Sequence, residues 1–393
     1  MYAEHRSGNT SRRYLCRQSR LLVSLTIGLV LVGAVLLWPK SRALVVEVPR
    51  AEPSLTASAA LGGSFVFRFD PALPESEAFQ VFTIPTTGAT PDGIAVFNRP
   101  YTTEVWFAES GADRIGHLIY TGTTDYNLQE YELPAGSRPL NVVVDNAGIA
   151  WFTENGRNQI GRIDGATGIT HEFVISTTTV APMDLDIAPD GSVWFTERGT
   201  DHIGQLIITD TTDYEVREFF VLPVGWSDAG LSGILVENDD RIWAVLSDYD
   251  RLARLKPSVP QVDRTPPLPT TPGYPLMLVA DPDGVRMWFT ELYGNHISIV
   301  FGSTNEFGLR YTVPTTNSRP YDLDVDSTGA VWFSEQLGGK IGQLVVTTTA
   351  AFTEFPVPLP RARIQGLAVD SNDVVWFVAD TWHTVNLPLV MRR

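Results

Sequence analysis

One pattern of apolar and polar residues recurs along most of this chain. In each copy, a short apolar run is followed by a turn containing Asp or Gly and then by the dipeptide Trp-Phe, or a near equivalent, inside a second apolar run. Short apolar runs bounded by turn residues predict β-strands. Seven tryptophans mark the copies at intervals of 43 to 49 residues: Trp106, Trp151, Trp194, Trp243, Trp288, Trp332 and Trp376. A period in the forties built from short strands predicts an all-β, seven-bladed β-propeller.

The third copy shows the four strands that we expect in each blade. They are predicted at residues 184–188, 192–197, 202–207 and 214–223, separated by turn residues such as Asp190-Gly191. Adjacent residues of a strand point to opposite faces. The neighbouring Trp and Phe should therefore place one aromatic ring against each adjacent blade.

The last copy has too little chain for four strands. Only residues 384–390 offer a further strand after Trp376, and no outer strand follows. Residues 79–85 match the outer strands of other copies, such as 130–134 and 354–358, but have no blade of their own. We therefore expect 79–85 to close the last blade, within a propeller that spans residues 62–393. Residues 64–69 are left as either an additional strand or part of the preceding linker.

The amino-terminal region predicts a membrane or export segment. Residues 21–38 are an uncharged apolar run of 18 residues, which just reaches the length of a membrane span. The basic residues within 1–20 place the amino terminus in the cytoplasm and the propeller outside. A cleaved signal peptide is the alternative, so the protein is expected to be either a single-pass membrane protein or secreted. Residues 39–61 contain several Pro, Ala and Ser residues and are predicted to be a linker.

The charge of the chain limits its partners. Residues 1–42 carry seven basic residues and one acidic residue, so the remainder accounts for −22 against a formal net charge of −16 for the whole chain. An acidic body argues against nucleic acid or an anionic lipid surface as its main partner. It is compatible with cations, cationic ligands or simple solubility. The single cysteine, Cys16, excludes an intramolecular disulfide.

Carboxylates recur at the end of the second strand of most copies. The end of the second strand and the start of the first strand lie on the same face of a propeller, so these groups should surround its axis. Several carboxylates there could hold Mg²⁺ or Ca²⁺; alternatively, each satisfies backbone N–H groups of its own turn. The candidate metal ligands are Glu109, Glu154, Glu197, Glu291, Glu335 and Asp380. The starts of the first strands add Asp92, Asn141, Asp184, Tyr321, Asp322 and Gln365.

The repeated motif resembles that of the streptogramin B lyases, also called virginiamycin B lyases. The motif combines Pro, an apolar strand, Trp-Phe-Thr-Glu and Ile-Gly-Gln or Ile-Gly-Arg, and it is clearest in residues 139–163, 182–206 and 320–344. The resemblance covers about residues 79–390. It implies a seven-bladed propeller and an enzyme that opens a cyclic depsipeptide antibiotic by Mg²⁺-dependent elimination at its ester linkage.

The chain departs from this family at the catalytic positions. The family's Pro-His at the start of blade six corresponds here to Pro320-Tyr321. Its Glu-Pro-His-Gly-Ile in the last blade corresponds to residues 363–367, so that Arg363 stands for a metal-binding Glu and Gln365 stands for the base. Glutamine takes no proton near neutral pH, and arginine is a permanent cation that repels Mg²⁺. Asp380 matches the second metal carboxylate, and Asp92 stands in the His place of the first repeat.

These departures favour a ligand-binding or scaffold module over a lyase. The candidate ligand-binding residues are Tyr321, Arg363 and Gln365, on the same face as Asp380, and the partner would be a small molecule, a peptide or a surface protein. One rival is a Mg²⁺- or Ca²⁺-dependent lyase, or a lactonase-type hydrolase, with Asp92 as base and Tyr321 beside it. Another is a structural surface protein that displays the Pro-rich segment 256–275, which is predicted to be a surface loop.

Overall fold

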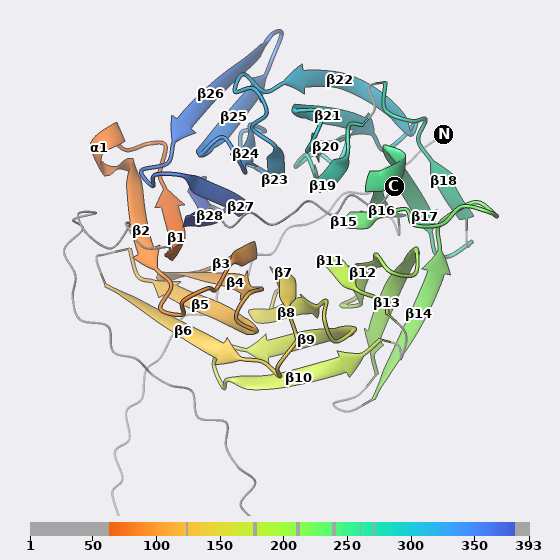
Figure 1. Ribbon diagram of the computed structural model, residues 1–393, viewed down its shortest axis with the longest axis horizontal. Coiled ribbons are helices and arrows are strands. Elements are labelled where there is room, and N and C mark those ends of the chain that lie inside the picture. Colours follow the sequence, from red (N-terminus) through yellow and green to blue (C-terminus); the bar gives the residue numbers. More distant parts are fainter. Residues whose placement is uncertain are drawn as a thin grey trace, which may run out of the picture. The chain divides into compact units, whose positions relative to one another are not determined.

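Seven four-stranded antiparallel sheets are arranged in a ring (Figure 1). This computed structural model describes residues 63–381 except 123–124, 176–178, 210–212, 238–240, 260 and 270–271. The arrangement confirms the predicted seven-bladed propeller. The segments predicted at 1–20, 21–38 and 39–61, and the strand predicted at 384–390, lie outside the described residues. Within the described part, no helix has the length and apolar character needed to cross a membrane.

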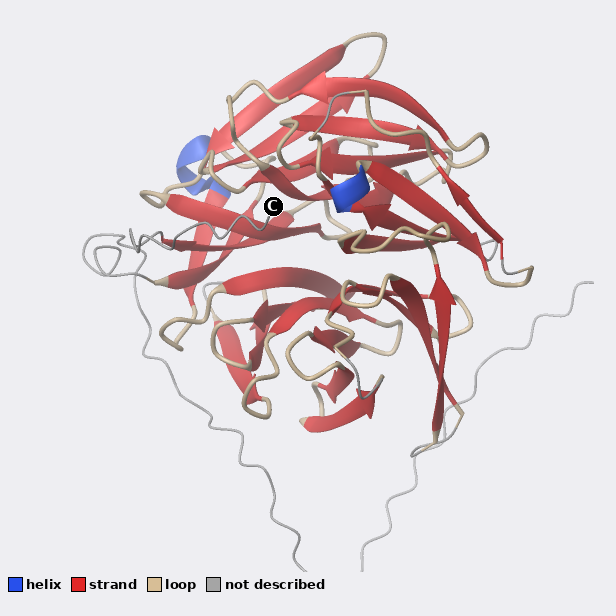
Figure 2. Cartoon of the chain, turned by 45° about the vertical axis from the view of Figure 1, so that its right-hand side comes forward, coloured by secondary structure: helices blue, strands red, loops and turns tan. Residues whose placement is uncertain are grey.

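Each blade contributes one strand to the centre of the ring, and three more strands follow toward the rim (Figures 1 and 2). The inner strands of blades one to seven are β3 (Pro91–Arg99), β7 (Pro139–Val144), β11 (Pro182–Ile187), β15 (Leu231–Glu237), β19 (Pro275–Ala280), β23 (Pro320–Val325) and β27 (Ala362–Val369). The second strands are β4 (Thr102–Glu109), β8 (Ile149–Glu154), β12 (Val193–Glu197), β16 (Arg241–Leu246), β20 (Arg286–Glu291), β24 (Val331–Glu335) and β28 (Val375–Thr381).

The outer half of each blade is built from the third and fourth strands. The third strands are β5 (Arg114–Tyr120), β9 (Gln159–Asp164), β13 (His202–Ile208), β17 (Arg251–Lys256), β21 (His296–Phe301), β25 (Lys340–Val346) and β1 (Ser64–Phe69). The outer strands are β6 (Tyr126–Glu132), β10 (Ile169–Val174), β14 (Tyr214–Phe220), β18 (Gln261–Arg264), β22 (Glu306–Thr312), β26 (Ala350–Pro356) and β2 (Phe79–Thr83). Two short helical turns, α1 (Glu75–Ala78) and η2 (Ser247–Tyr249), lie in loops.

Blade seven joins the two ends of the propeller. Its strand order is β2-β1-β28-β27, so two strands from before the first repeat complete a sheet begun by the last one. β2 takes the outer place for which residues 79–85 were predicted. β1 takes the third place and pairs with β28 from Ser64 opposite Asp380 to Phe69 opposite Val375. The pairing covers the free edge that β28 would otherwise expose.

The Trp-Phe dipeptides form the contacts between blades. Trp332 packs in the same cluster as Phe67 and Phe377 of blade seven, whereas the adjacent Phe333 packs with Trp288 of blade five. All seven repeat tryptophans are buried, and five of them have no exposed surface. This confirms that the neighbouring rings face opposite sides of the strand, and it identifies these aromatic residues as core.

Carboxylates on the inner strands connect neighbouring blades. Asp184 accepts a hydrogen bond from the N–H of Ile234 in the next blade at 2.8 Å, and Asp322 accepts one from the N–H of Leu367 at 2.9 Å. Gly366 shows how closely the inner strands approach, because a β-carbon there would lie 2.2 Å from the carbonyl oxygen of Asp92. The starts of the inner strands are therefore held at fixed positions around the axis.

The Pro-rich segment 256–275 is not entirely a surface loop, so that prediction was wrong in part. Gln261–Arg264 forms β18, the outer strand of blade four, and pairs with β17. Thr265 and Leu268 are buried, with exposed fractions of 0% and 3%. The backbone N–H of Leu268 donates to the carbonyl of Asp250 at 2.8 Å. Proline hid the strand from the sequence pattern because the residues between the prolines are too few to show alternation.

Candidate ligand-binding site at the mouth of the central channel

The inner strands surround a central cavity of about 370 Å³. Most of the residues that line it are aliphatic, with Val142, Leu185, Ile234 and Leu278 among them. The carboxylates that reach it, such as Asp184, are occupied by backbone N–H groups of the inner strands. A separate group of polar side chains lies at one end of the channel, at the starts of the inner strands. We call this end the mouth.

Three of the predicted site residues meet at the mouth. Asp92 lies at the start of β3, Tyr321 at the start of β23 and Gln365 in β27, which are the inner strands of blades one, six and seven. The Tyr321 hydroxyl donates a hydrogen bond to Oδ1 of Asp92 at 3.0 Å, although 229 residues separate them. Ring closure therefore brings together residues from opposite ends of the repeat array.

The environment of this cluster raises the pKa values of Asp92 and Tyr321. Burial raises the pKa of Asp92 to about 6, while the Tyr321 hydrogen bond and the positive charge of Arg363 partly oppose the rise. Burial, together with the negative charge of Asp92, raises the pKa of Tyr321 well above its ordinary value. Tyr321 is consequently a neutral hydrogen-bond donor, and Asp92 changes its charge close to neutral pH.

Gln365 supplies a second acceptor beside Asp92. The residue is 7% exposed, and its Oε1 atom has no hydrogen-bond partner among the described residues. A buried carbonyl oxygen without a partner costs on the order of 1–3 kcal/mol, which a ligand donor can recover. Asp92 and Gln365 together therefore favour a ligand that offers N–H or O–H groups.

Arg363 and Asp380 form an ion pair next to this cluster. The Nε of Arg363 donates to Oδ1 of Asp380 at 2.8 Å, and Nη2 of Arg363 donates to Oδ2 of the same carboxylate. Burial opposes the charge on Arg363, but the contacts with Asp380 outweigh it and raise the arginine pKa. The carboxylate that the family resemblance assigns to a metal is thus bound at both oxygens by a permanent cation.

The other carboxylates predicted as metal ligands are not brought together. Each lies at the end of the second strand of its own blade, and Glu109, Glu154, Glu197, Glu291 and Glu335 are all 0% exposed. Across residues 63–381, outside the short undescribed segments, no three His, Cys, Asp or Glu side chains are placed to hold a metal ion. The residues at the mouth and in this ring therefore do not fit a divalent metal.

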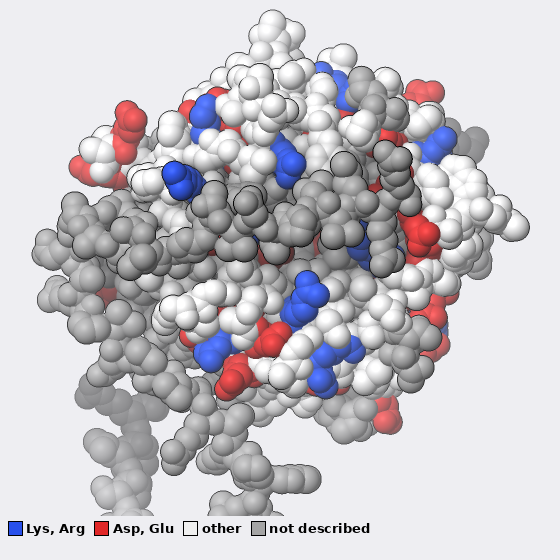
Figure 3. All heavy atoms as spheres, viewed as in Figure 1, with Lys and Arg blue, Asp and Glu red and all other residues white. Residues whose placement is uncertain are grey.

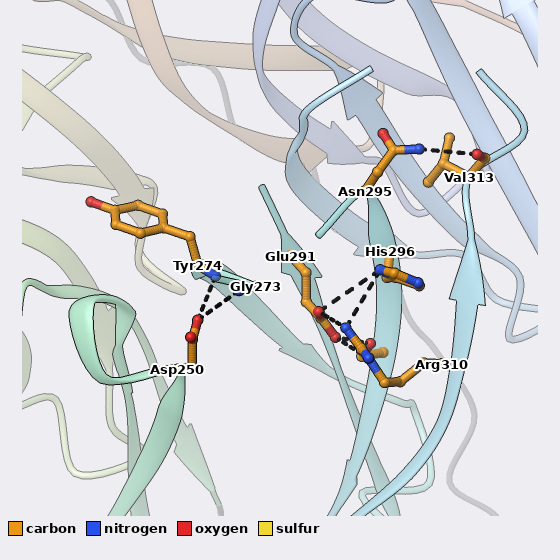
Figure 4. A network of polar contacts seen from close by, with 9 residues as sticks. Asp250, Gly273, Tyr274, Glu291, Asn295, His296, Arg310 and Val313 are labelled. Carbon is orange, nitrogen blue, oxygen red and sulfur yellow. Dashed lines mark hydrogen bonds and ion pairs between the residues drawn. The ribbon is translucent and has the colours of Figure 1, made fainter. Parts of the chain in front are cut away.

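The environments of these glutamates differ from blade to blade. Figure 4 shows Glu291 beside Arg310 and His296; its Oε1 accepts hydrogen bonds from Ser298 at 2.5 Å and from Nε of Arg310 at 2.7 Å. By contrast, neither carboxylate oxygen of Glu109 has a hydrogen-bond partner within the described structure.

Among the described residues, both carboxylate oxygens of Glu154 and of Glu335 also lack a hydrogen-bond partner. Burial raises the pKa of Glu109 to about 8 and that of Glu154, Glu197 and Glu335 to about 7. The side chains of Glu109, Glu154 and Glu335 therefore do not accept hydrogen bonds from backbone N–H groups of their turns. The alternative expectation is wrong for these three residues.

The rim of the mouth is polar on one side and apolar on the other. One position is equivalent in all inner strands, directly after the last residue that pairs with the second strand before the register shift. Its seven residues are Asp92, Leu140, Met183, Ser232, Leu276, Tyr321 and Gln365. The three residues that form the polar cluster come from neighbouring blades, whereas blades two, three and five carry Leu or Met. The mouth therefore suits a ligand with one polar and one apolar side.

Figure 3 shows Lys and Arg side chains interspersed with Asp and Glu side chains on the face that it draws. Two further arginine residues lie on the face of the propeller that carries the mouth, the mouth face, because Arg198 follows the end of β12 and Arg319 precedes the start of β23. Sequence reasoning found Arg363 but missed Arg198 and Arg319, which lie in turns at this face. Their separation of 121 residues offered no local signal.

Comparisons with known proteins cover the propeller. The profile of the Virginiamycin B lyase family matches residues 73–194 and 166–387, which together span more than half of the chain. The virginiamycin B lyase of Nocardia farcinica is 27% identical to the chain over 233 residues, which is 58% of this chain and 73% of the relative.

Solved structures show the same architecture. A streptogramin B lyase is 24% identical and superposes with a TM-score of 0.66, covering 81% of this chain and 97% of that one. A catalytically inactive virginiamycin B lyase from Staphylococcus aureus, crystallised with quinupristin, is 25% identical with a TM-score of 0.63 and covers 75% of this chain and 97% of its own. The similarity therefore extends around the whole ring.

Proposed function

We propose a ligand-binding function for this chain, which belongs to the virginiamycin B lyase family. The ligand is a small molecule or peptide held at the mouth, and it is not cleaved through a metal ion. The observation that carries this proposal is the pair of acceptors formed by Asp92 and the unpartnered Oε1 of Gln365. A family relative that was crystallised with quinupristin supports a cyclic peptide as the first ligand to try.

The metal-dependent reaction of the family has no support in the residues at this mouth. Arg363 and Gln365 stand where the resemblance implies a metal-binding glutamate and a histidine base. Asp380 is engaged by Arg363 through two hydrogen bonds. A second cation beside Arg363 would be repelled, since both carry permanent charge and share one carboxylate.

The proposed location of this binding site is outside the cytoplasm. The support is the apolar run at residues 21–38 with basic residues before it, which is typical of a signal-anchor or an export signal. In that setting the propeller would bind ligands from the surroundings of the cell, either tethered to the membrane through residues 39–61 or released.

We expect quinupristin to bind the full-length protein saturably and to be recovered unchanged in the presence of Mg²⁺. Calorimetry measures the affinity, and chromatography detects a ring-opened isomer. In Gln365→Leu the affinity should fall about tenfold, as expected for one lost hydrogen bond to a buried acceptor. Gln261→Leu, at an exposed outer strand, is the matched control and should bind normally. Absence of binding, or ring opening that requires Mg²⁺, would overturn the proposal.

A second candidate function is metal-independent elimination or hydrolysis with Asp92 as general base. The observation in its favour is burial, which raises the pKa of Asp92 to about 6 and so makes its carboxylate a better base near neutral pH. Tyr321 would then donate a proton from the hydroxyl that now contacts Asp92. Ring opening that persists with chelator, rises with pH through about 6 and disappears in Asp92→Asn would establish this function.

A further inference from the structure

Four side chains from three blades form a continuous array on the mouth face. Nη2 of Arg198 donates to the Tyr274 hydroxyl at 3.0 Å. The ring centroids of Tyr274 and Tyr293 lie 4.8 Å apart with an interplanar angle of 42°. The guanidinium carbon of Arg319 lies 5.4 Å from the centroid of the Tyr293 ring. We call these four residues the Arg-Tyr array: two guanidinium groups flank two aromatic rings.

The array is held in place by the backbone. Tyr274 has a left-handed conformation, with φ of 53°, and its N–H donates to Oδ1 of Asp250 at 2.7 Å (Figure 4). The turn that carries Tyr293 is bonded to the same loop, since the N–H of Tyr293 donates to the carbonyl of Gly273 at 3.1 Å. Non-glycine residues in this conformation cost about 1–3 kcal/mol each, and they persist where the surrounding structure fixes them.

Arg319 has the same left-handed backbone conformation as Tyr274. It has φ of 56° and precedes Pro320 and Tyr321, so the array approaches the polar cluster of the mouth along the chain. Its carbonyl accepts the N–H of Gln336 at 3.1 Å. The turns that carry the array are therefore fixed in their backbone before a ligand binds, which reduces the ordering cost of binding.

The exposure and charge of the array suit a particular ligand chemistry. Tyr293 is 52% exposed, and the Arg198 side chain is 33% exposed. Guanidinium groups bind carboxylates through paired hydrogen bonds, and tyrosine rings stack on flat apolar groups. Asp248 competes for Arg198, because its carboxylate lies 3.9 Å from Nη2 of Arg198. Three further acidic residues, Asp201, Asp228 and Asp250, lie near Asp248.

We propose that the Arg-Tyr array is a binding site for an aromatic carboxylate, either a free acid or such a group on a larger ligand held at the mouth. The aromatic ring packs on the exposed part of Tyr293, and the carboxylate accepts hydrogen bonds from Arg319, while Arg198 at the other end adds positive charge to the array. This inference rests on the proposed ligand-binding function, because it assigns a second part of the ligand to the same mouth. It requires a negative charge, whereas the Asp92 and Gln365 cluster requires hydrogen-bond donors.

The probe for this site is 2-naphthoate, with the neutral 2-naphthamide as the matched ligand. Calorimetry on the full-length protein should show naphthoate binding about tenfold tighter than naphthamide, and binding that weakens with added salt. Arg319→Gln and Tyr293→Leu should each reduce naphthoate affinity about tenfold. Arg217→Gln, on the outer strand β14 and paired with Glu215, is the matched control and should change nothing.

A further variant tests the direction of the charge effect. Asp248→Asn removes the acidic competitor and should strengthen naphthoate binding severalfold, while leaving naphthamide unaffected. Equal affinity for the two probes, or unchanged affinity in Arg319→Gln, would overturn the inference. If quinupristin still binds in a Gln365-dependent manner in that case, the proposed function stands and only the array assignment fails. If neither quinupristin nor naphthoate binds, both fail.

Discussion

Raising the pH from about 5 to about 8 is expected to lower the Tm of the propeller by on the order of 5–10 °C. The cause is the set of buried carboxyl groups whose pKa values are raised by burial. It includes the glutamates at the second-strand ends, and also Asp184 and Asp322 on the inner strands, with pKa values of about 7 and about 8. Glu109 keeps its proton in the folded state up to about pH 8, and Glu154 and Glu197 keep theirs up to about pH 7, compared with an ordinary value of 4.5.

The sign follows from proton binding. Between about pH 4.5 and pH 8 the folded state holds protons that the unfolded chain has released, so the free energy of unfolding falls as pH rises, by about 1.4 kcal/mol per pH unit for each such proton. This stabilisation is complete below the ordinary glutamate pKa of 4.5, and it is lost as the pH rises through about 7 to about 8. Groups such as Glu104, where hydrogen bonds from His117 and Arg99 outweigh burial and lower the pKa, act only at more acidic pH.

Matched amide variants separate this effect from a general loss of stability. Glu109→Gln should raise the Tm at about pH 8 and weaken the pH dependence, because the amide is neutral throughout. Glu291→Gln should lower the Tm, because Glu291 accepts hydrogen bonds from Ser298 and Arg310, and the variant leaves a buried guanidinium without its carboxylate. Melting curves recorded across the pH range measure these effects. A Tm that rises between pH 5 and pH 8 would contradict the expectation that buried, protonated carboxyl groups stabilise the fold.

Replacing Phe67 with alanine is expected to destabilise the propeller by about 3–5 kcal/mol. Phe67 lies at the middle of β1, is 0% exposed, and stacks on Phe377 with centroids 4.9 Å apart. It belongs to the cluster that joins blade six to blade seven. Loss of its ring therefore weakens the contact between β1 and β28, which closes the propeller, as well as the core.

Urea unfolding compares this variant with Phe220→Ala. Phe220 is also a strand phenylalanine, but it is 49% exposed on the outer strand of blade three. Its replacement should cost about 1 kcal/mol or less. Equal destabilisation by the two changes would mean that β1 does not close the ring, and an unchanged urea midpoint for Phe67→Ala would mean the same.

The sequence was sufficient for the fold because the core is encoded in every repeat. The spacing of Trp106 and its equivalents determined the number of blades, and the adjacent Phe residues determined which faces are buried. The third strand of the last blade was predicted wrongly: residues 384–390 were expected to follow Trp376 in that blade, but β1 takes the place next to β28. Residues 64–69 lie before the first repeat and follow no Trp-Phe motif, so only the pairing of β1 with β28 in three dimensions identifies them.

The candidate site was only partly predictable. Motif comparison with the lyases pointed to Tyr321, Arg363 and Gln365, and the structure brings Tyr321 within hydrogen-bond distance of Asp92. Among the described residues, the glutamates at the second-strand ends are not brought together in a group that could hold a metal ion. A residue repeated at the end of each second strand lies in its own blade at a distance from the axis, so repetition does not imply convergence. The Arg-Tyr array arises from turns of separate blades, and no spacing in the sequence reveals it.

The most direct test of the account is a calorimetric titration of Mg²⁺ into the full-length protein. Because Arg363 holds both oxygens of Asp380, the account predicts no saturable binding at the mouth. It also predicts that Arg363→Glu, which replaces the cation by a second carboxylate, gains measurable Mg²⁺ affinity. Stoichiometric Mg²⁺ binding to the unaltered protein that is lost in Asp380→Asn would contradict the account, and would indicate a metal centre of the kind that the family resemblance implies.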